Sequence, residues 1–181
     1  LVVKRDEFSG EFFIQNSMSK RSIFRSLPVV VFLLGISVAM LFKLNTFTEG
    51  ATEPLIYDTG VLFKKILLNN YLVCVTIVLG FLTFGLSSVL TVFYNGYIFG
   101  ICMASLPIHK IGYHFLSYSI LESLGFIISG QVAMAISLLL YASLFQKDVD
   151  QTKSRVIVKK SLISITLIFV AAIIEVYVSI H

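Results

Sequence analysis

Residues 66–109 read ILLNNYLVCVTIVLGFLTFGLSSVLTVFYNGYIFGICMASLPIH and contain no Asp, Glu, Lys or Arg. A transmembrane helix needs about 20 predominantly apolar residues to cross the hydrocarbon core of a bilayer. This uncharged stretch of 44 residues is therefore long enough for two such helices and a tight turn. It places the chain in a membrane.

The composition of the whole chain agrees with a membrane location. Hydrophobic residues make up 57% of the 181 residues, charged residues make up 13%, and the mean hydropathy is +0.92. A typical soluble domain is about 45–50% apolar and about 25% charged. Because 24 charges cannot cover the surface of so small a globule, a soluble enzyme, a disordered tail and a nucleic-acid-binding module are excluded as default interpretations.

The turn within the uncharged stretch is predicted at Tyr94-Asn95-Gly96, because an Asn-Gly pair readily adopts positive φ angles. The two arms then form spans at about 69–93 and 96–109. The second arm has only 14 residues, so it is tilted, continues past the following proline, or crosses the membrane only in part.

Three further apolar runs bring the count to about five spans, at residues 26–43, 119–146 and 160–180. The sequence thus predicts an all-α, polytopic membrane helical bundle, with one transmembrane domain over residues 26–181. Ahead of it, Phe8 and Phe12 lie one helical turn apart among charged residues. This spacing predicts an amphipathic interfacial helix within residues 1–25, on the cytoplasmic face.

The basic residues indicate an orientation. Ten of the fourteen form two blocks: Lys4, Arg5, Lys20, Arg21 and Arg25, then Lys147, Lys153, Arg155, Lys159 and Lys160. Basic residues that flank apolar runs face the cytoplasm, and this explains the net charge of +4 without nucleic acid as a partner. Both basic blocks can face the cytoplasm only if the chain crosses the membrane an even number of times between them, and spans one to four give that number. The N-terminus is therefore expected in the cytoplasm and the C-terminus outside.

Two carboxylates fall inside predicted spans, Glu122 and Glu175. A charge there costs about 3 kcal/mol on insertion scales, so such residues usually face the bundle interior and often have a role. At about 1.5 Å per residue, both are expected within about 10 Å of the outer interface, with His114 at the same level and Tyr118 beside Glu122. This cluster would form a substrate or ion entrance, or the side chains would simply snorkel to the interface.

Catalytic and metal-binding patterns are missing from the sequence. Two histidines, His109 and His114, are five residues apart, which puts them on different faces of a helix. We therefore expect a non-enzymatic protein without a metal or cofactor.

Small residues recur at four-residue spacing in two predicted spans: Gly96, Gly100 and Ala104, then Ser129, Ala133 and Ser137. Such ridges let helix backbones approach closely, within one chain or between chains.

Several of these residues form a larger pattern that runs along residues 66–145: Asn69-Asn70, Gly80, Gly85, Asn95-Gly96-Tyr97-Ile98-Phe99-Gly100, Glu122 and Gly130. The pattern resembles the stage II sporulation protein M family of integral membrane proteins. The family usually has a His-Gly pair ahead of the glutamate, whereas this chain has Tyr118-Ser119. Proton or ligand chemistry of that histidine is therefore not implied here.

The resemblance implies a non-catalytic, multi-span component of a bacterial cell membrane. At 181 residues the chain is similar to short relatives found with bacteriocin genes beside ABC transporters. The expected partners are membrane lipid, other membrane proteins such as a transporter ATPase or permease, a peptide cargo, and a second copy of the chain. Three alternatives stay open: a scaffold for peptidoglycan-remodelling proteins in sporulation, a small stand-alone transporter or channel with Glu122 as its coupling residue, and an intramembrane enzyme.

Overall fold

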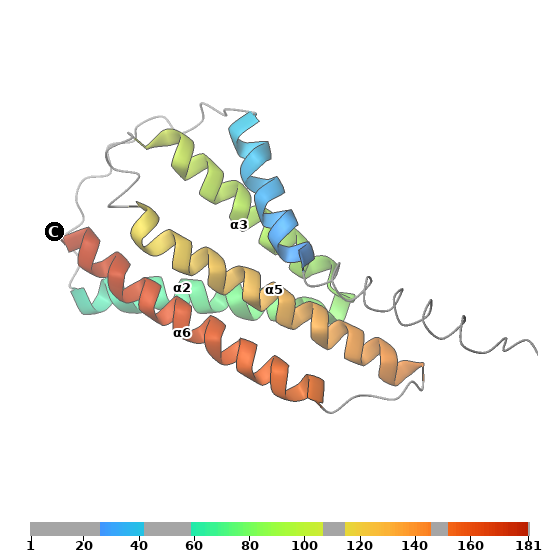
Figure 1. The fold of residues 1–181 in the computed structure, drawn as a ribbon. Coiled ribbons are helices and arrows are strands. Elements are labelled where there is room, and N and C mark those ends of the chain that lie inside the picture. Colours follow the sequence, from blue (N-terminus) through green and yellow to red (C-terminus); the bar gives the residue numbers. More distant parts are fainter. Residues whose placement is uncertain (1–25, 42–58, 107–114, 146–151, 181) are drawn as a thin grey trace, which may run out of the picture.

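The computed structural model describes residues 26–41, 59–106, 115–145 and 152–180, and all of its regular structure is helical (Figure 1). The elements are an N-terminal helix Ser26–Leu41, α2 Thr59–Leu79, the 3₁₀ helix η1 Gly80–Thr83, α3 Leu86–Ser105, α5 Leu116–Leu144 and α6 Thr152–Ile180. The all-α prediction is confirmed. The amphipathic helix predicted within residues 1–25 lies outside the described residues.

Four helices are long and apolar enough to cross a membrane, judged by length and composition: Thr59–Thr83, Leu86–Ser105, Leu116–Leu144 and Ser154–Ser179. The N-terminal helix is apolar but shorter. Because an α-helix rises about 1.5 Å per residue, its 16 described residues cover about 24 Å of a hydrocarbon core about 30 Å thick. The described chain is a multi-pass membrane bundle of five helices.

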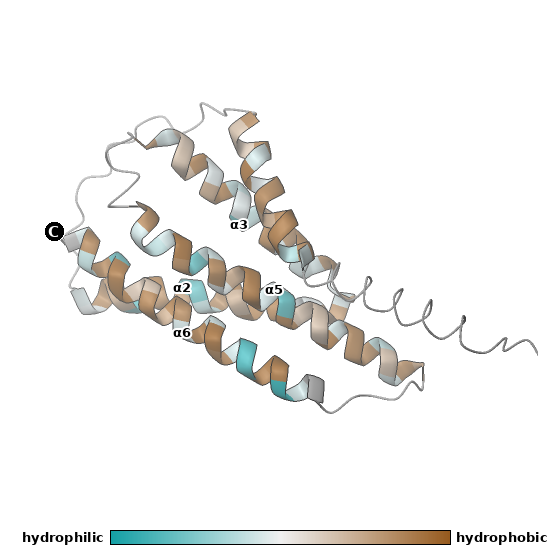
Figure 2. Cartoon of the chain, viewed as in Figure 1, coloured by the Kyte–Doolittle hydropathy of each residue, from teal (hydrophilic) through white to brown (hydrophobic). Residues whose placement is uncertain are grey.

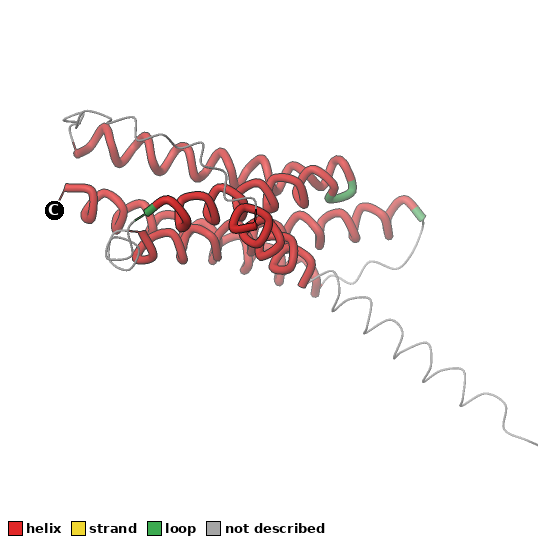
Figure 3. The backbone as a smooth tube through the Cα atoms, turned by 90° about the horizontal axis from the view of Figure 1, so that it is seen from above, coloured by secondary structure: helices red, strands yellow, loops and turns green. Residues whose placement is uncertain are grey.

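Helices that follow one another in the sequence run in opposite directions (Figures 1 and 3). The start of the N-terminal helix, the α2–α3 turn, the end of α5 and the start of α6 therefore share one end of the bundle, which we name the basic end. Leu41, Thr59, Ser105, Leu116 and Ile180 share the opposite end. The even number of crossings between the two basic blocks fits this arrangement. Which side of the membrane the basic end faces stays a prediction.

The turn between α2 and α3 lies ten residues before the predicted position, so the prediction at Tyr94-Asn95-Gly96 is wrong. The chain reverses where η1 is followed by Phe84 and Gly85, whose φ angles of 51° and 91° are both left-handed. The N–H group of Gly85 donates to the carbonyl oxygen of Gly80 at 2.9 Å, a bond typical of a helix end. Residues 96–105 of the predicted short arm form the second half of the full-length helix α3.

Asn95 and Gly96 stay helical because both make contacts that require the helical conformation of α3. The Asn95 side-chain amide donates to the carbonyl oxygen of Thr91 in the same helix at 2.8 Å. Gly96 is buried against the backbone of Phe32 in the N-terminal helix. The turn preference of an Asn-Gly pair is a local tendency, and here tertiary packing overrides it.

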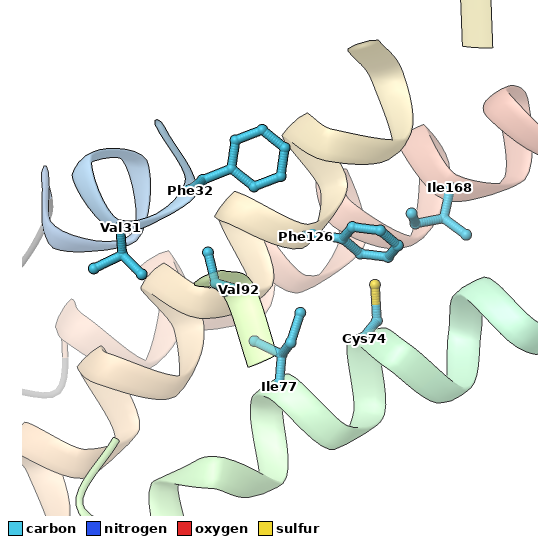
Figure 4. Packing of buried hydrophobic residues seen from close by; sticks show 7 residues of the cluster. All are labelled: Val31, Phe32, Cys74, Ile77, Val92, Phe126 and Ile168. Carbon is cyan, nitrogen blue, oxygen red and sulfur yellow. The ribbon is translucent and has the colours of Figure 1, made fainter. Parts of the chain in front are cut away.

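All five helices contribute to one hydrophobic cluster (Figure 4). Its buried members are Val31, Phe32, Cys74, Ile77, Val92, Phe126 and Ile168. Around this cluster, α5 and α6 lie side by side and form the most extensive contact among α2, α3, α5 and α6, and α2 packs against both. The cluster fixes the relative positions of the polar side chains that α2, α5 and α6 carry.

Candidate functional site: an intramembrane polar cluster

The carboxyl group of Glu122 in α5 lies within interaction range of the side chain of Asn70 in α2. Asn70 is only 4% exposed, and its Oδ1 atom accepts a hydrogen bond from the Asn69 amide at 3.3 Å. This leaves the Asn70 amide nitrogen as the group that can donate to Glu122. The amide and carboxyl groups tie the second and fourth helices together inside the membrane.

Glu175 in α6 lies close enough for its carboxyl group to interact electrostatically with Glu122 and with the Tyr118 hydroxyl group. Tyr118 precedes Glu122 by four residues, so both lie on the same face of α5. We refer to Asn70, Tyr118, Glu122 and Glu175 as the Glu122 cluster. The structure thus brings together four residues singled out from the sequence, and His114 lies outside the described residues.

The depth of the Glu122 cluster follows from its position along the helices. Glu122 is six residues from the start of α5, and Glu175 is five residues from the end of α6. At about 1.5 Å per residue, both lie about 8–9 Å inside the opposite end of the bundle. Both side chains are half-buried.

The chemistry of the Glu122 cluster follows from its donor and acceptor groups. Two carboxyl groups, a phenol and an amide can bind a proton or a small cation, and the same groups can join helices by hydrogen bonds. The part of the chain that the structure describes holds no group of three or more His, Cys, Asp or Glu residues arranged to bind a metal ion.

A second polar contact connects α2, α5 and α6 nearer the middle of the bundle. The Ser164 hydroxyl group donates to the carbonyl oxygen of Gly125 at 2.8 Å, and its oxygen lies 2.8 Å from the Ser129 hydroxyl oxygen. Because Ser164 has a single hydroxyl hydrogen, Ser129 is the donor in the second bond. The Cys74 sulfur lies 3.9 Å from the Ser164 oxygen. We call Cys74, Gly125, Ser129 and Ser164 the serine cluster.

Sequence reasoning identified Ser129 as part of a small-residue ridge but missed Ser164. The available signal was a serine in the middle of the run Leu162 to Ile168, which is apolar except for Ser164 and Thr166. A hydroxyl group within a span is expected to find a partner there.

The glycine ridge on α3 is occupied by the chain's own N-terminal helix. A Cβ atom placed on Gly96 would overlap the carbonyl oxygen of Phe32, and one placed on Gly100 would lie 2.8 Å from the Ala39 Cβ atom. Ala104 is exposed, so this contact ends at Gly100. The ridge serves packing within the chain.

The remaining glycines of the sequence pattern also lie at close contacts. Gly130 of α5 faces Pro28 and Val92, where an added Cβ atom would lie 3.0 Å from the Pro28 Cβ atom. Gly80 and Gly85 form the two ends of the α2–α3 turn. The second ridge, with Ser129, Ala133 and Ser137, is buried throughout.

The family model described as stage II sporulation protein M matches residues 28–180, a wider range than the residues 66–145 expected from the sequence pattern. An uncharacterized protein of Methanocaldococcus jannaschii is 28% identical over 167 residues, which are 84% of this chain and 94% of the relative. No solved structure matches the chain. The matched residues run from the N-terminal helix to the end of α6, and the chain belongs to the stage II sporulation protein M family of membrane proteins.

Proposed function

We propose that the protein is a non-catalytic subunit of a membrane complex that works beside an ABC-type transporter in the maturation, export or immunity of a peptide such as a bacteriocin. The subunit proposal rests on one observation. Polar side chains inside the membrane form contacts that join one helix to another. Asn70 interacts with Glu122, and Ser129 is hydrogen-bonded to Ser164. Such bonds hold a bundle in one arrangement, which a subunit needs in order to present a fixed surface to its partners.

The association with a transporter is supported by the resemblance to short family members. A scaffold for peptidoglycan-remodelling proteins in sporulation is the alternative that the family description suggests. Endospores are formed by bacteria, whereas the relative that covers 84% of this chain comes from an archaeon. This distribution favours a role outside sporulation.

A small transporter or channel is the second candidate, and the Glu122 cluster favours it. Two carboxyl groups from α5 and α6 lie at one depth in the bundle, with Tyr118 beside them. Carboxyl groups inside spans often mark ion or proton pathways. In this candidate Glu122 is the coupling residue.

Purification from native membranes in a mild detergent, followed by identification of co-purifying proteins, tests the subunit proposal. We expect a stoichiometric ATP-binding transporter subunit. A peptidoglycan hydrolase in its place would support the sporulation alternative. A monodisperse, partner-free protein with full biological activity would contradict both.

The variant Glu122→Gln separates the subunit from the transporter. Gln keeps the shape and a hydrogen-bond acceptor but cannot titrate. The subunit proposal expects unchanged co-purification and activity, because the side chain can still interact with Asn70. The transporter candidate expects a folded protein that has lost ion or substrate flux in proteoliposomes.

The orientation is tested by cysteine labelling with a membrane-impermeant reagent. We expect a cysteine at position 50 to be labelled from outside and a cysteine at position 153 only from the cytoplasm. Labelling of both positions from one side would overturn the proposed topology.

A further inference from the structure

One polar contact between α5 and α6 lies on the outside of the bundle. Lys160 of α6 donates a hydrogen bond to the side-chain oxygen of Gln131 in α5, and both residues are only half-buried. The contact between Ser129 and Ser164 in the same helix pair is, in contrast, fully buried. Hydrophilic positions interrupt the apolar surfaces of α5 and of the first half of α6 (Figure 2).

Apolar side chains surround this contact on both helices. The positions seven residues before and after Gln131 on α5, and one turn before and after Lys160 on α6, share the face of the helix that carries the contact. All four are large, apolar and exposed: Leu124, Leu138, Val156 and Ile163. We refer to these four residues with Gln131 and Lys160 as the Lys160 surface. It is an apolar, outward-facing surface with one polar pair at its centre.

The level of the Lys160 surface along the bundle follows from the α2–α3 turn. A Cβ atom placed on Gly85 would lie 2.8 Å from the Met134 side chain and 3.7 Å from the Ser137 hydroxyl oxygen, so the turn is level with these residues of α5. Gln131 precedes them by three and six residues. At about 1.5 Å per residue, it lies about 5–9 Å farther from the basic end than the turn does.

This level lies inside the hydrocarbon core of the bilayer. Leu82 and Phe84 in the turn are apolar and exposed, and such side chains avoid water, so the turn lies no farther out than the hydrocarbon edge. The ammonium group of Lys160, bonded to Gln131, is therefore deeper than that edge. A charged group at this depth is costly and usually pairs with another polar group. Lipid phosphates lie outside the hydrocarbon core.

The polar pair is positively charged. Gln131 is neutral, so the pair keeps the charge of the Lys160 ammonium group. An ammonium group has three donor hydrogens, and a carboxylate can therefore bind beside Gln131. In the described part of the chain the carboxylates are Glu122 and Glu175, and Glu122 is nine residues, or about 13 Å, from Gln131 along α5. The electrostatic complement of the Lys160 surface is a carboxylate at its own depth.

We propose that the Lys160 surface binds a transmembrane helix of a partner protein, with an aspartate or glutamate of that helix on Lys160, an assignment that rests on the subunit role proposed above. A helix can present a carboxylate inside the hydrocarbon core, whereas a lipid phosphate lies outside it. A second copy of the chain fits less well. Two copies related by a twofold axis along the membrane normal would bring Lys160 against Lys160, and like charges repel.

A synthetic transmembrane peptide is the probe for this site. The purified full chain is placed in phosphatidylcholine vesicles with a leucine–alanine helix that has one glutamate about 5–9 Å inside a hydrocarbon edge, and binding is measured by energy transfer. A matched peptide has glutamine at that position. We expect the glutamate peptide to bind about tenfold more tightly, since a charge-assisted hydrogen bond is stronger than a neutral one. A glutamate at the centre of the peptide should give a smaller gain.

Two variants change the Lys160 surface in different ways. Lys160→Met removes the ammonium group and keeps the apolar stem, so it should bind both peptides equally. Gln131→Glu keeps Lys160 and supplies a carboxylate from the same chain. It should unfold no earlier than the wild type and should also lose the preference, so it decides the matter if Lys160→Met does not fold. The matched control is Lys64→Met, an exposed lysine near the opposite end, which should keep the preference.

Equal binding of the glutamate and glutamine peptides by the wild type would overturn this assignment. In that case stabilisation by phosphatidylglycerol over phosphatidylcholine would assign the surface to lipid, and a dimer of the chain would assign it to a second copy. A preference that persists in Lys160→Met or Gln131→Glu, or that is lost equally in Lys64→Met, would also overturn it.

Co-purification from native membranes separates this assignment from the subunit role. A partner that is lost from both Lys160→Met and Gln131→Glu is the expected result. A partner that both variants retain would overturn the assignment of the Lys160 surface and leave the subunit role intact. Absence of any partner in the wild type would contradict the subunit role, and the peptide measurement would still decide whether the surface binds a carboxylate.

Discussion

Two helix pairs in this bundle are held together by different chemistry. The N-terminal helix and α3 meet through glycines, with Gly35 on one helix and Gly96 and Gly100 on the other set against backbone atoms of the partner. In contrast, α5 and α6 are joined by the hydroxyl groups of Ser129 and Ser164. Lipid tails are as apolar as leucine, so burial of apolar surface does not drive helices together in a membrane. Close backbone approach and hydrogen bonding are the two remaining ways. The N-terminal helix and α3 use the first, whereas α5 and α6 combine a close approach at Gly125 with hydrogen bonds between side chains.

The largest effect is expected where a side chain would meet backbone. Gly96→Val places a Cβ atom on the Phe32 carbonyl oxygen, and the overlap is relieved only when the two helices separate. We expect a loss of about 3 kcal/mol, at the upper end of the range for overpacking, measured by thermal unfolding in detergent. Gly100→Leu should cost less, because the atoms nearest to its Cβ position, the Ala39 Cβ atom at 2.8 Å and the Ile36 backbone at 3.0 Å, are farther away than the Phe32 oxygen is from that of Gly96.

The control for this pair is Ala104→Val, an exposed position eight residues along the same helix. It should leave the unfolding midpoint unchanged. Equal stability of the Gly96 and Ala104 variants would show that the close approach of the two helices does not occur.

A smaller loss is expected at the polar contact between α2 and α5. Glu122→Leu leaves the buried Asn70 amide without its carboxyl partner, which costs about 2 kcal/mol. Glu122→Gln retains an acceptor and should unfold close to the wild type. The measurement is a double-mutant cycle with Asn70→Leu, in which the second substitution should cost little once the first has been made. Full stability and function of Glu122→Leu would make the residue a passenger at the lipid boundary.

The serine cluster should contribute less to the stability of the fold than the contact between Asn70 and Glu122. Ser164→Ala removes the bonds to Gly125 and Ser129, with an expected loss of about 1 kcal/mol. Ser161→Ala is the matched control, because its hydroxyl group bonds only to the Ile157 carbonyl oxygen of its own helix. A loss of similar size in the control would mean that the bond between helices carries no stability of its own.

The smallest effect is expected at the turn that links α2 to α3, and it has the opposite sign. Phe84 adopts φ 51° and is 58% exposed, so its side chain adds strain without compensating burial. Phe84→Gly should stabilise the fold by about 0.5 kcal/mol. The neighbouring Leu82→Gly, within η1 and 66% exposed, should destabilise it. A loss of stability in both variants, or a gain of stability in both, would contradict this account of the turn.

Sequence reasoning predicted the fold class because hydropathy alone sets the number of helices. It misplaced the α2–α3 turn because the residues from Leu79 to Gly85 are apolar and look like the middle of a span. The Asn95-Gly96 pair carried the stronger local turn preference. That preference is overridden by Phe32, a residue more than 60 positions away, against which Gly96 packs. Such a contact is not visible in a local pattern.

The two carboxylates of the candidate site were predictable from the sequence, whereas their partners on other helices were not. Glu122 and Glu175 stand out because carboxylates are rare in apolar runs, and the structure places them near each other. Asn70 emerged only as part of the family pattern, and its interaction with Glu122 depends on the register between α2 and α5. Ser164 was missed because serine is common in membrane helices. Its importance shows only in the structure, where Ser129 on the facing helix is its hydrogen-bond partner.

The six-residue reversal from Gly80 to Gly85 has a consequence for how the chain enters the membrane. It contains no charged residue that could hold the turn in water while only α2 is inserted. Two of its exposed side chains, Leu82 and Phe84, are apolar, and the hydroxyl group of the third, Thr83, donates to the Gly80 carbonyl oxygen. The α2–α3 pair is therefore built to enter the bilayer as one hairpin during biosynthesis. Because a hairpin adds two crossings at once, its entry leaves the sidedness of every later segment unchanged.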